Sequence, residues 1–216
     1  MKKQVDDKHY TFSSYVSKGR WASYYNQIEE ALSIKGNNIL VIGIGDGIVV
    51  DVLKKYKSVT TFDFEKDLHP DILGSVEDFS KLVTKDYDCI ICCQVLEHLP
   101  FEKFESIVKN ISSHTKEKFI LSLPNRNLSI NFRIYLPIIK QLKLNIPIIR
   151  FWDKKFEISK QGFNEHYWEV NAKGYSNKRI KKILKKSCII NKVFTDLEIT
   201  THIFYILFPI EGENNG

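Results

Sequence analysis

Gly43, Gly45 and Gly47 directly follow a run of four aliphatic residues, and a helix-like pattern follows the glycines. Glycine adopts positive φ freely and lets a ligand lie against bare backbone. The N-terminus of a following helix adds unpaired N–H groups. Asp63 lies 20 residues after Gly43, where an acid in a doubly wound sheet can accept hydrogen bonds from ribose hydroxyls. This pattern predicts a nucleotide-type cofactor site, although Gly-x-Gly-x-Gly differs from the dinucleotide fingerprint Gly-x-Gly-x-x-Gly.

A second polar group follows another apolar run, Cys89 to Cys93, and contains Gln94, Glu97 and His98. Histidine titrates near neutrality and is therefore a plausible base for removing the proton of a hydroxyl acceptor. The structural alternative for His98 is a residue at a helix entry that fastens the turn by hydrogen bonding. The sequence leaves both roles open.

A third polar group is Glu165-His166-Tyr167, far along the chain. His166 is a second candidate base. The alternative is that His166 has only a structural role, packed in an aromatic cluster with Tyr167 and Trp168. We predict no metal site, because no histidine spacing indicates one. The remaining histidines considered for this purpose are His9, His69, His114 and His202.

The elements that must position these groups are read from hydrophobic periodicity. Trp21, Tyr24, Ile28 and Leu32 recur at helical spacing, which predicts an N-terminal amphipathic helix. Strand and helix patterns then alternate, as in a parallel sheet with right-handed crossovers, and two final strands suit an antiparallel hairpin. The predicted elements are strand Asn38–Ile42, helix Gly47–Lys57, strands Val59–Asp63 and Cys89–Gln94, helix Phe101–Ser113, strand Phe119–Leu123, helix Asn177–Lys186, and strands Cys188–Asp196 and Thr201–Phe208.

The combination resembles the class I S-adenosylmethionine-dependent methyltransferases. Gly43-Ile-Gly-Asp-Gly47 is similar to the first motif of that family, Phe-Asp63 to its ribose-binding acid, and Tyr87 to Pro100 to its strand ending in Val-Leu-Glu-His-Leu. The resemblance extends over nearly the whole chain, to a bacterial and archaeal subgroup of small methyltransferases. Further matching segments are Tyr15–Tyr24, Leu68–Val76, Ile120–Asn125, Phe163–Glu169 and Lys173–Ser176.

The resemblance implies a doubly wound α/β fold with a mostly parallel seven-stranded sheet and an antiparallel C-terminal hairpin. It also implies S-adenosyl-L-methionine as cofactor and S-adenosyl-L-homocysteine as product. Two departures from the family pattern are Val41, where a larger acid is usual, and Ser75, where an acidic adenine contact is usual. From the residues themselves, the candidate catalytic residues are His166, His98 and Glu97. The implied cofactor-binding residues are Gly43, Ile44, Gly45, Asp46, Gly47, Asp63, Phe64, Ser75, Val76, Gln94 and Val95.

We therefore predict a methyltransferase that acts on a small-molecule or saccharide-type acceptor, with O-methylation by in-line transfer. The alternative is a module with the same fold that binds the cofactor without catalysis, or that binds RNA. The basic segment Lys178–Lys186 tempts a nucleic-acid interpretation. At 3.6 residues per turn, however, its apolar residues form one face and its cations the other, so we interpret it as an ordinary solvated helix face and consider nucleic acid an improbable partner.

The chain is predicted to be a single domain of 216 residues with an N-terminal helical cap over residues 9–36. After the fifth strand we predict an insertion over residues 127–172. Its segment 127–160 is apolar, is interrupted by Pro137 and Pro147, and resists assignment to a regular strand or helix. Three interpretations stay open: a packed subdomain, a lid over the active site, and a peripheral membrane patch with basic residues.

The bulk composition is that of a globular protein, with 43% hydrophobic and 27% charged residues. The net charge of +6 permits an anionic partner without identifying one. Cys89-x-x-Cys92 is either a zinc or redox pair or, as we favour, two small buried residues in a reducing cytosol. The polar N-terminus and the absence of an apolar run of about 18 residues predict a cytoplasmic protein without a signal peptide or spanning helix. The oligomeric state is not predicted.

Overall fold

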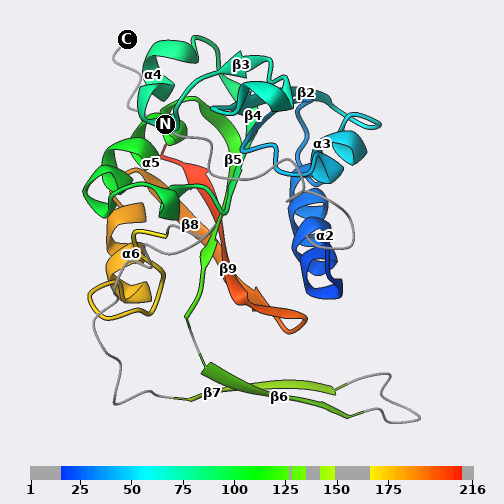
Figure 1. Ribbon diagram of the computed structural model, residues 1–216, viewed down its shortest axis with the longest axis vertical. Coiled ribbons are helices and arrows are strands. Elements are labelled where there is room, and N and C mark those ends of the chain that lie inside the picture. The colour runs from blue at the N-terminus through cyan, green and yellow to red at the C-terminus, as the bar shows by residue number, and fades with distance from the viewer. Residues whose placement is uncertain (1–15, 127, 135–141, 149–165, 211–216) are drawn as a thin grey trace.

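The computed structural model describes residues 16–126, 128–134, 142–148 and 166–210. Its main feature is a seven-stranded sheet in the order β3-β2-β1-β4-β5-β9-β8 (Figure 1). The first five of these strands along the chain pair in parallel, and β9 pairs antiparallel with both β5 and β8. The predicted fold class is therefore confirmed. The strands are β1 (Asn38–Ile42), β2 (Ser58–Asp63), β3 (Ile72–Leu73), β4 (Tyr87–Cys93), β5 (Thr115–Pro124), β8 (Cys188–Asp196) and β9 (Ile199–Pro209).

Helices cover both faces of the sheet, with α2 and α3 on one side and α4, α5 and α6 on the other (Figure 1). The helix α2 lies within the predicted N-terminal cap, and its first turn is capped by the Ser17 hydroxyl, which accepts a hydrogen bond from the Arg20 N–H. The α-helices are α2 (Lys18–Leu32), α3 (Ile48–Leu53), α4 (Phe79–Leu82), α5 (Phe104–Ser113) and α6 (Asn177–Leu184), and the short 3₁₀ helices are η1 (Lys66–Leu68), η2 (Val76–Asp78), η3 (Leu96–His98) and η4 (Phe101–Lys103).

The central strands are buried on both faces, and their side chains alternate between two cores. Leu40 and Ile42 of β1 pack into the core under α4, α5 and α6, whereas Ile39 and Val41 pack into the core under α2 and α3. This two-sided burial explains why the strand sequences are continuous apolar runs and do not alternate with polar residues.

The same alternation decides the role of the cysteine pair. Cys92 belongs to the core under α4, α5 and α6, and Cys89 to the core on the opposite face of the sheet. Two thiols on opposite faces cannot bind one zinc ion or form one disulfide. Both are buried free thiols, and burial raises their pKa values. The interpretation of these cysteines as small core residues is confirmed.

The chain reverses its direction across the sheet between β1 and β4. After β1 it adds β2 and β3 on one side, and it then returns to place β4 on the other side. Both β2 and β4 pair directly with β1. In open α/β sheets the crevice outside the carboxyl ends of the strands at such a point is where ligands bind. The topology therefore brings the glycines after β1, the acid at the end of β2 and the polar turn after β4 to one edge.

Part of the insertion is regular, which corrects the prediction that residues 127–160 resist assignment to a strand or helix. The strands β6 (Leu128–Ile134) and β7 (Leu142–Ile148) form a separate antiparallel two-stranded sheet beyond the end of β5 (Figure 1). Pro147 lies opposite Ser129 in this sheet. A two-stranded sheet leaves one edge of each strand unpaired, and a proline without an N–H is tolerated there.

The other predicted lid residues, 127, 135–141 and 149–165 with Glu165 among them, lie outside the described residues. A lid or membrane role for the insertion thus stays a prediction. Within the described ranges, no helix is both long and apolar enough to span a bilayer.

The basic helix α6 has the amphipathic arrangement predicted from its spacing. Ile180 and Leu184 are fully buried against the core. The Arg179 guanidinium of α6 lies 4.5 Å from the centre of the Phe101 ring, and Nζ of Lys186, just after the helix, lies 2.8 Å from Glu105 Oε1. This supports the interpretation of α6 as an ordinary helix packed on the sheet.

A cluster of aromatic rings fastens the last part of the insertion to the rest of the domain. Trp168 is fully buried, and its ring centre lies 5.0 Å from those of Phe101 and Phe104. Its indole Nε1–H donates a 3.0 Å hydrogen bond to the Leu99 carbonyl. Trp168 therefore fixes the position of the residues before it, His166 and Tyr167, relative to the turn after β4.

Replacing Trp168 should test how much this cluster stabilises the fold. We expect Trp168→Ala to lower the free energy of unfolding by about 3–5 kcal/mol, the usual cost of emptying a large buried site. Trp168→Phe should cost about 1–3 kcal/mol, because the Leu99 carbonyl loses its partner. Urea unfolding followed by circular dichroism measures both values. Trp21→Ala is the control, since Trp21 is 45% exposed. If Trp21→Ala lowered the free energy of unfolding as much as Trp168→Ala, the stabilising role assigned to Trp168 would be refuted.

Candidate functional site

The glycine turn after β1 has the backbone conformation that the sequence predicted. Gly43, Gly45 and Gly47 have φ values of 84°, 60° and 81°, all in the left-handed region that residues with a side chain rarely adopt. The Gly43 N–H donates a 2.9 Å hydrogen bond to the Phe62 carbonyl in β2. Gly47 begins α3 without a side-chain cap. The turn is thus an exposed stretch of backbone held at the carboxyl edge of the sheet.

The two sides of the chain reversal touch at Gly43. A β-carbon at this position would lie 2.5 Å from Cγ2 of Val95, which follows β4. Among the described residues, apart from the two chain neighbours of Gly47, no heavy atom lies within 4 Å of a β-carbon built on this glycine. Gly43 is therefore required by close packing as well as by its φ, whereas Gly47 faces open space.

Asp63, at the end of β2, ties this turn in place. Its Oδ2 accepts a 2.8 Å hydrogen bond from the Ile44 N–H, and its Oδ1 accepts one of 2.9 Å from the Glu65 N–H. Only 6% of the residue is exposed. Burial raises the pKa of Asp63, and these backbone hydrogen bonds oppose that shift. A carboxylate has about four lone-pair positions, so two remain for hydroxyl groups of a ligand.

Other predicted cofactor residues lie around the same crevice. Asp46, within the glycine turn, accepts hydrogen bonds from the Tyr24 hydroxyl of α2 and, at 3.3 Å, from the Ile48 N–H. Phe64 follows β2 directly and is half-buried. Ser75 follows the short strand β3 and caps η2 through its hydroxyl, which accepts from the Glu77 N–H. Val76 has an apolar side chain, and this side chain is buried in the core.

Gln94 lies at the carboxyl end of β4 with a φ of 57°, a conformation uncommon for a residue with a side chain. Its side-chain Nε2 donates a 3.1 Å hydrogen bond to the Ser122 hydroxyl of β5, and its backbone N–H donates to the Ser122 carbonyl. Strain of this sort at the end of a central strand is typical of functional sites. Val95 follows at once and forms the contact with Gly43 described above.

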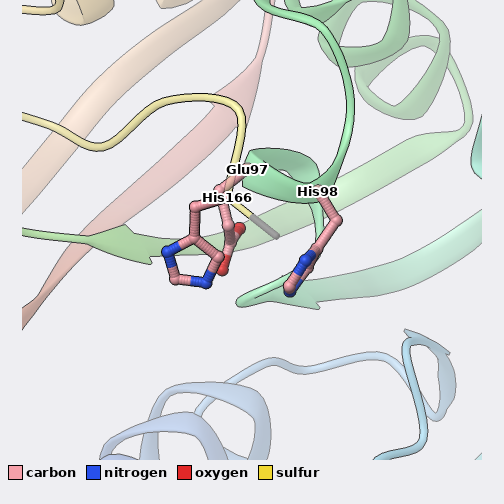
Figure 2. A group of neighbouring side chains, drawn as sticks. All are labelled: Glu97, His98 and His166. Atoms are coloured by element: carbon pink, nitrogen blue, oxygen red, sulfur yellow. The ribbon is translucent and has the colours of Figure 1, made fainter. Parts of the chain in front are cut away.

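Three predicted catalytic residues, Glu97, His98 and His166, come together although His166 lies far away in the sequence (Figure 2). Each offers one ligand atom, and these atoms lie within 4.8 Å of one another. The rings of His98 and His166 have their centres 4.9 Å apart and meet edge to face. A backbone hydrogen bond of 2.8 Å from the Tyr167 N–H to the Glu97 carbonyl joins the two segments. We refer to these three side chains as the Glu-His-His cluster.

The electrostatics of this cluster are unusual. Glu97 is completely buried, and neither Oε1 nor Oε2 has a hydrogen-bond partner in the described part of the chain. Burial raises the pKa of Glu97 to about 7, with a partly opposing effect from His166. Burial also lowers the pKa of His166, but its hydrogen bond to Glu169 and the nearby charge of Glu97 outweigh this and raise it overall. Buried carboxyl groups without partners are rare in folded proteins.

Two further residues complete the surroundings of the cluster and were not found from the sequence. His166 Nδ1 donates a hydrogen bond to Glu169 Oε1 over 2.9 Å. In the sequence, the only indication of this contact is that Glu169 lies three residues after His166. His202 on β9 is buried and lies 3.2 Å from the Ser23 hydroxyl of α2. Burial, together with the charges of Arg20 and His166, lowers the pKa of His202 to about 4. Nothing in the local sequence indicated that His202 is near this site.

Comparison with known proteins agrees with this architecture. No protein-family model matches the chain. A segment of 125 residues is 28% identical to ubiquinone biosynthesis O-methyltransferase from Coxiella burnetii (strain Dugway 5J108-111) and covers 50% of this chain and 51% of that protein. The chain thus spans about half the length of the curated relatives it matches.

Two solved structures match over nearly their whole length. An S-adenosylmethionine-dependent methyltransferase from Clostridium acetobutylicum ATCC 824 has a TM-score of 0.56 at 13% identity and covers 93% of this chain and 95% of its own. A glycopeptide N-methyltransferase, solved with S-adenosyl-L-homocysteine, has a TM-score of 0.58 at 10% identity, with 91% of each chain covered. Together with the strand order, these likenesses show that the chain has the class I S-adenosylmethionine-dependent methyltransferase fold.

The difference between Gly43 and Gly47 gives a test of the turn. Gly47→Ala should lower the free energy of unfolding by about 1–2 kcal/mol, the cost of a left-handed conformation for a residue with a β-carbon. Gly43→Ala carries the same cost and also collides with Val95, so we expect about 2–5 kcal/mol in total. Urea unfolding of the two variants measures the difference. Equal losses would show that the close approach of Gly43 to Val95 is wrong.

Proposed function

We propose that this protein transfers a methyl group from S-adenosyl-L-methionine to an oxygen atom of a small hydroxyl-bearing acceptor. The observation that carries this proposal is the left-handed glycine turn after β1, tied by the Asp63 carboxylate, at the point where the sheet reverses direction. The cofactor occupies the crevice over residues 43–47. The acceptor lies on the far side of the methyl group, beside the Glu-His-His cluster.

Asp63 supports the cofactor part of the proposal. Its two carboxylate oxygens each hold one backbone N–H, which fixes their orientation before a ligand arrives. The remaining lone pairs are available to the two ribose hydroxyls. Ser75 stands where an acidic adenine contact is usual, so its hydroxyl and the neighbouring backbone serve the adenine. Two proteins of this fold, a glycopeptide N-methyltransferase and a magnesium protoporphyrin IX methyltransferase, have been solved with S-adenosyl-L-homocysteine, and the first also with sinefungin.

The chemistry at this edge is a single displacement. The acceptor oxygen attacks the methyl carbon in line with the departing sulfur, the C–O bond forms, and the C–S bond breaks with its electron pair left on sulfur as a neutral thioether. The acceptor proton must leave its oxygen near the transition state. The sulfonium is already activated, so the protein chiefly positions the nucleophile and excludes water. The Glu-His-His cluster is the polar group suited to assist the loss of that proton.

Transfer to oxygen, as opposed to nitrogen, is supported by sequence likeness. The relative from Coxiella burnetii is a ubiquinone biosynthesis O-methyltransferase. A hydroxyl needs help in losing its proton, and the two imidazoles and carboxylate gathered at β4 can give it.

Removing the Asp63 charge should weaken cofactor binding. We expect Asp63→Asn to reduce the affinity for S-adenosyl-L-homocysteine by about 10- to 150-fold, the equivalent of 1.5–3 kcal/mol for hydrogen bonds to a charged group. Isothermal titration calorimetry gives the dissociation constants. Asp71→Asn is a matched control, because Asp71 also accepts two hydrogen bonds from β2, from the N–H and the hydroxyl of Thr61. An unchanged affinity in Asp63→Asn, or an equal loss in Asp71→Asn, would contradict the assignment.

The acceptor atom is tested with methyl-labelled S-adenosyl-L-methionine and paired acceptors that differ only in carrying a hydroxyl or an amine. We expect the label on oxygen, found by mass spectrometry, with release of S-adenosyl-L-homocysteine. Loss of one member of the cluster, in His166→Ala, should reduce kcat/KM by about 10²–10⁴-fold while S-adenosyl-L-homocysteine still binds. Label on amines alone would make this an N-methyltransferase. Tight cofactor binding with no transfer to any acceptor would favour the non-catalytic alternative.

A further inference from the structure

We propose that the Glu-His-His cluster is a binding site for one divalent transition-metal ion, and that this ion receives the acceptor oxygen. The role given to the ion rests on the proposed function, whereas its binding does not. The donor set is one carboxylate oxygen of Glu97 and one imidazole nitrogen each of His98 and His166, whose ligand atoms lie within 4.8 Å of one another (Figure 2). Catalytic metal sites typically have three protein ligands and leave further coordination positions open for water or substrate.

The first support is the state of the Glu97 carboxyl group. It is fully buried, and neither oxygen has a hydrogen-bond partner in the described ranges. Buried charges in proteins are paired or coordinate metals, because an isolated carboxylate is expensive to remove from water. A cation between the carboxylate and the two imidazoles supplies the missing partner.

The second support is the orientation of His166. Its Nδ1 donates to the Glu169 carboxylate over 2.9 Å, so the lone pair lies on Nε2, the other ring nitrogen. Imidazoles that bind metals almost always donate their second N–H to a carboxylate or carbonyl in this way, which fixes the tautomer and makes the ligand more basic. Glu169 is therefore a positioning residue that acts through His166.

The geometry needs only a small adjustment. Ligand atoms that lie about 2.1 Å from a tetrahedral ion are about 3.4 Å from one another. In the structure the ligand atoms lie within 4.8 Å of one another. Side-chain rotations that move each ligand atom by about 1 Å would bring them to the shorter spacing. The backbone positions are already fixed by the bond between Tyr167 and Glu97 and by the buried Trp168. Two imidazoles and one carboxylate suit zinc, manganese, iron, cobalt or nickel, since calcium takes oxygen ligands and magnesium usually keeps several waters.

An ion at this position accounts for proton loss from the acceptor. A hydroxyl oxygen that enters an open position on the ion has its pKa lowered by the positive charge. The proton then passes to solvent, and neither imidazole has to act as the base. This proposal departs from the prediction, made from sequence spacing, that the chain has no metal site. Spacing alone does not consider ligands from distant segments, and His166 reaches the cluster only through folding.

Metal binding is tested directly on the full chain after treatment with a chelator. Titration with Co²⁺ and Zn²⁺ should show one ion per chain, by calorimetry and by the visible absorption of bound cobalt. Glu97→Gln and His166→Ala should each weaken binding by at least 100-fold. Glu169→Gln should weaken it by about 10- to 100-fold, the usual effect of losing the carboxylate behind a metal-bound histidine. His114→Gln is the matched control, a partly buried histidine at the opposite edge of the sheet.

A thermal readout protects the test against variants that fail to fold. Saturating Zn²⁺ should raise the melting temperature of the wild-type chain and of His114→Gln, because the ion binds only the folded state. It should leave the melting temperature of Glu97→Gln unchanged, although that variant without metal should be at least as stable as the wild type, since it replaces an unpartnered buried carboxyl group by a neutral one.

Three results would overturn the proposal: no saturable binding, binding that survives both Glu97→Gln and His166→Ala, or a cobalt spectrum with thiolate charge-transfer bands, which would assign the ion to a cysteine. Titration of the same samples with S-adenosyl-L-homocysteine separates the two proposals. Cofactor binding without metal binding would refute the metal site and leave the proposed methyltransferase intact. Metal binding without cofactor binding would refute the proposed function alone.

Discussion

The pairing of β1 with both β2 and β4 is the constraint on which the site depends. It forces the chain to leave β1 through a turn that touches Val95 on one side and Phe62 and Asp63 on the other. Only a residue without a β-carbon fits at Gly43, because both its φ and the contact with Val95 exclude a side chain. The open backbone that suits a cofactor is thus a consequence of how the sheet is wound.

A second constraint positions the Glu-His-His cluster. The turn after β4 and the last part of the insertion are joined by a backbone hydrogen bond at Glu97 and by the indole of Trp168 at Leu99. This aromatic anchor is rigid, since Trp168 is enclosed by other rings. It holds His166 against Glu97 even though most of the insertion lies between them in sequence.

The sequence predicted the parts of this structure that are encoded locally. Strand β1 and the hairpin of β8 and β9 follow from apolar runs, and the glycine turn from its spacing. The helix after Gly47 is shorter than predicted, ending at Leu53 where Lys57 had been expected, since helix ends depend on contacts that periodicity does not record. The two-residue strand β3 is too short to have a periodicity. The contacts of Glu169 and His202 were not predicted, because the first depends on where His166 folds and the second joins β9 to α2.

Stability alone does not explain why Glu97 is a glutamate. A fully buried carboxyl group without a partner destabilises a fold, and an apolar residue of similar size would pack at that position at lower cost. The same turn carries a second cost at Gln94, whose φ is positive. Both costs fall on one short segment, at the carboxyl end of the central strand and next to the cofactor crevice. These energetically unfavourable residues are concentrated at one place, and their cost to the fold is only partly offset there. Such a concentration indicates that they are required by a ligand and not by the fold.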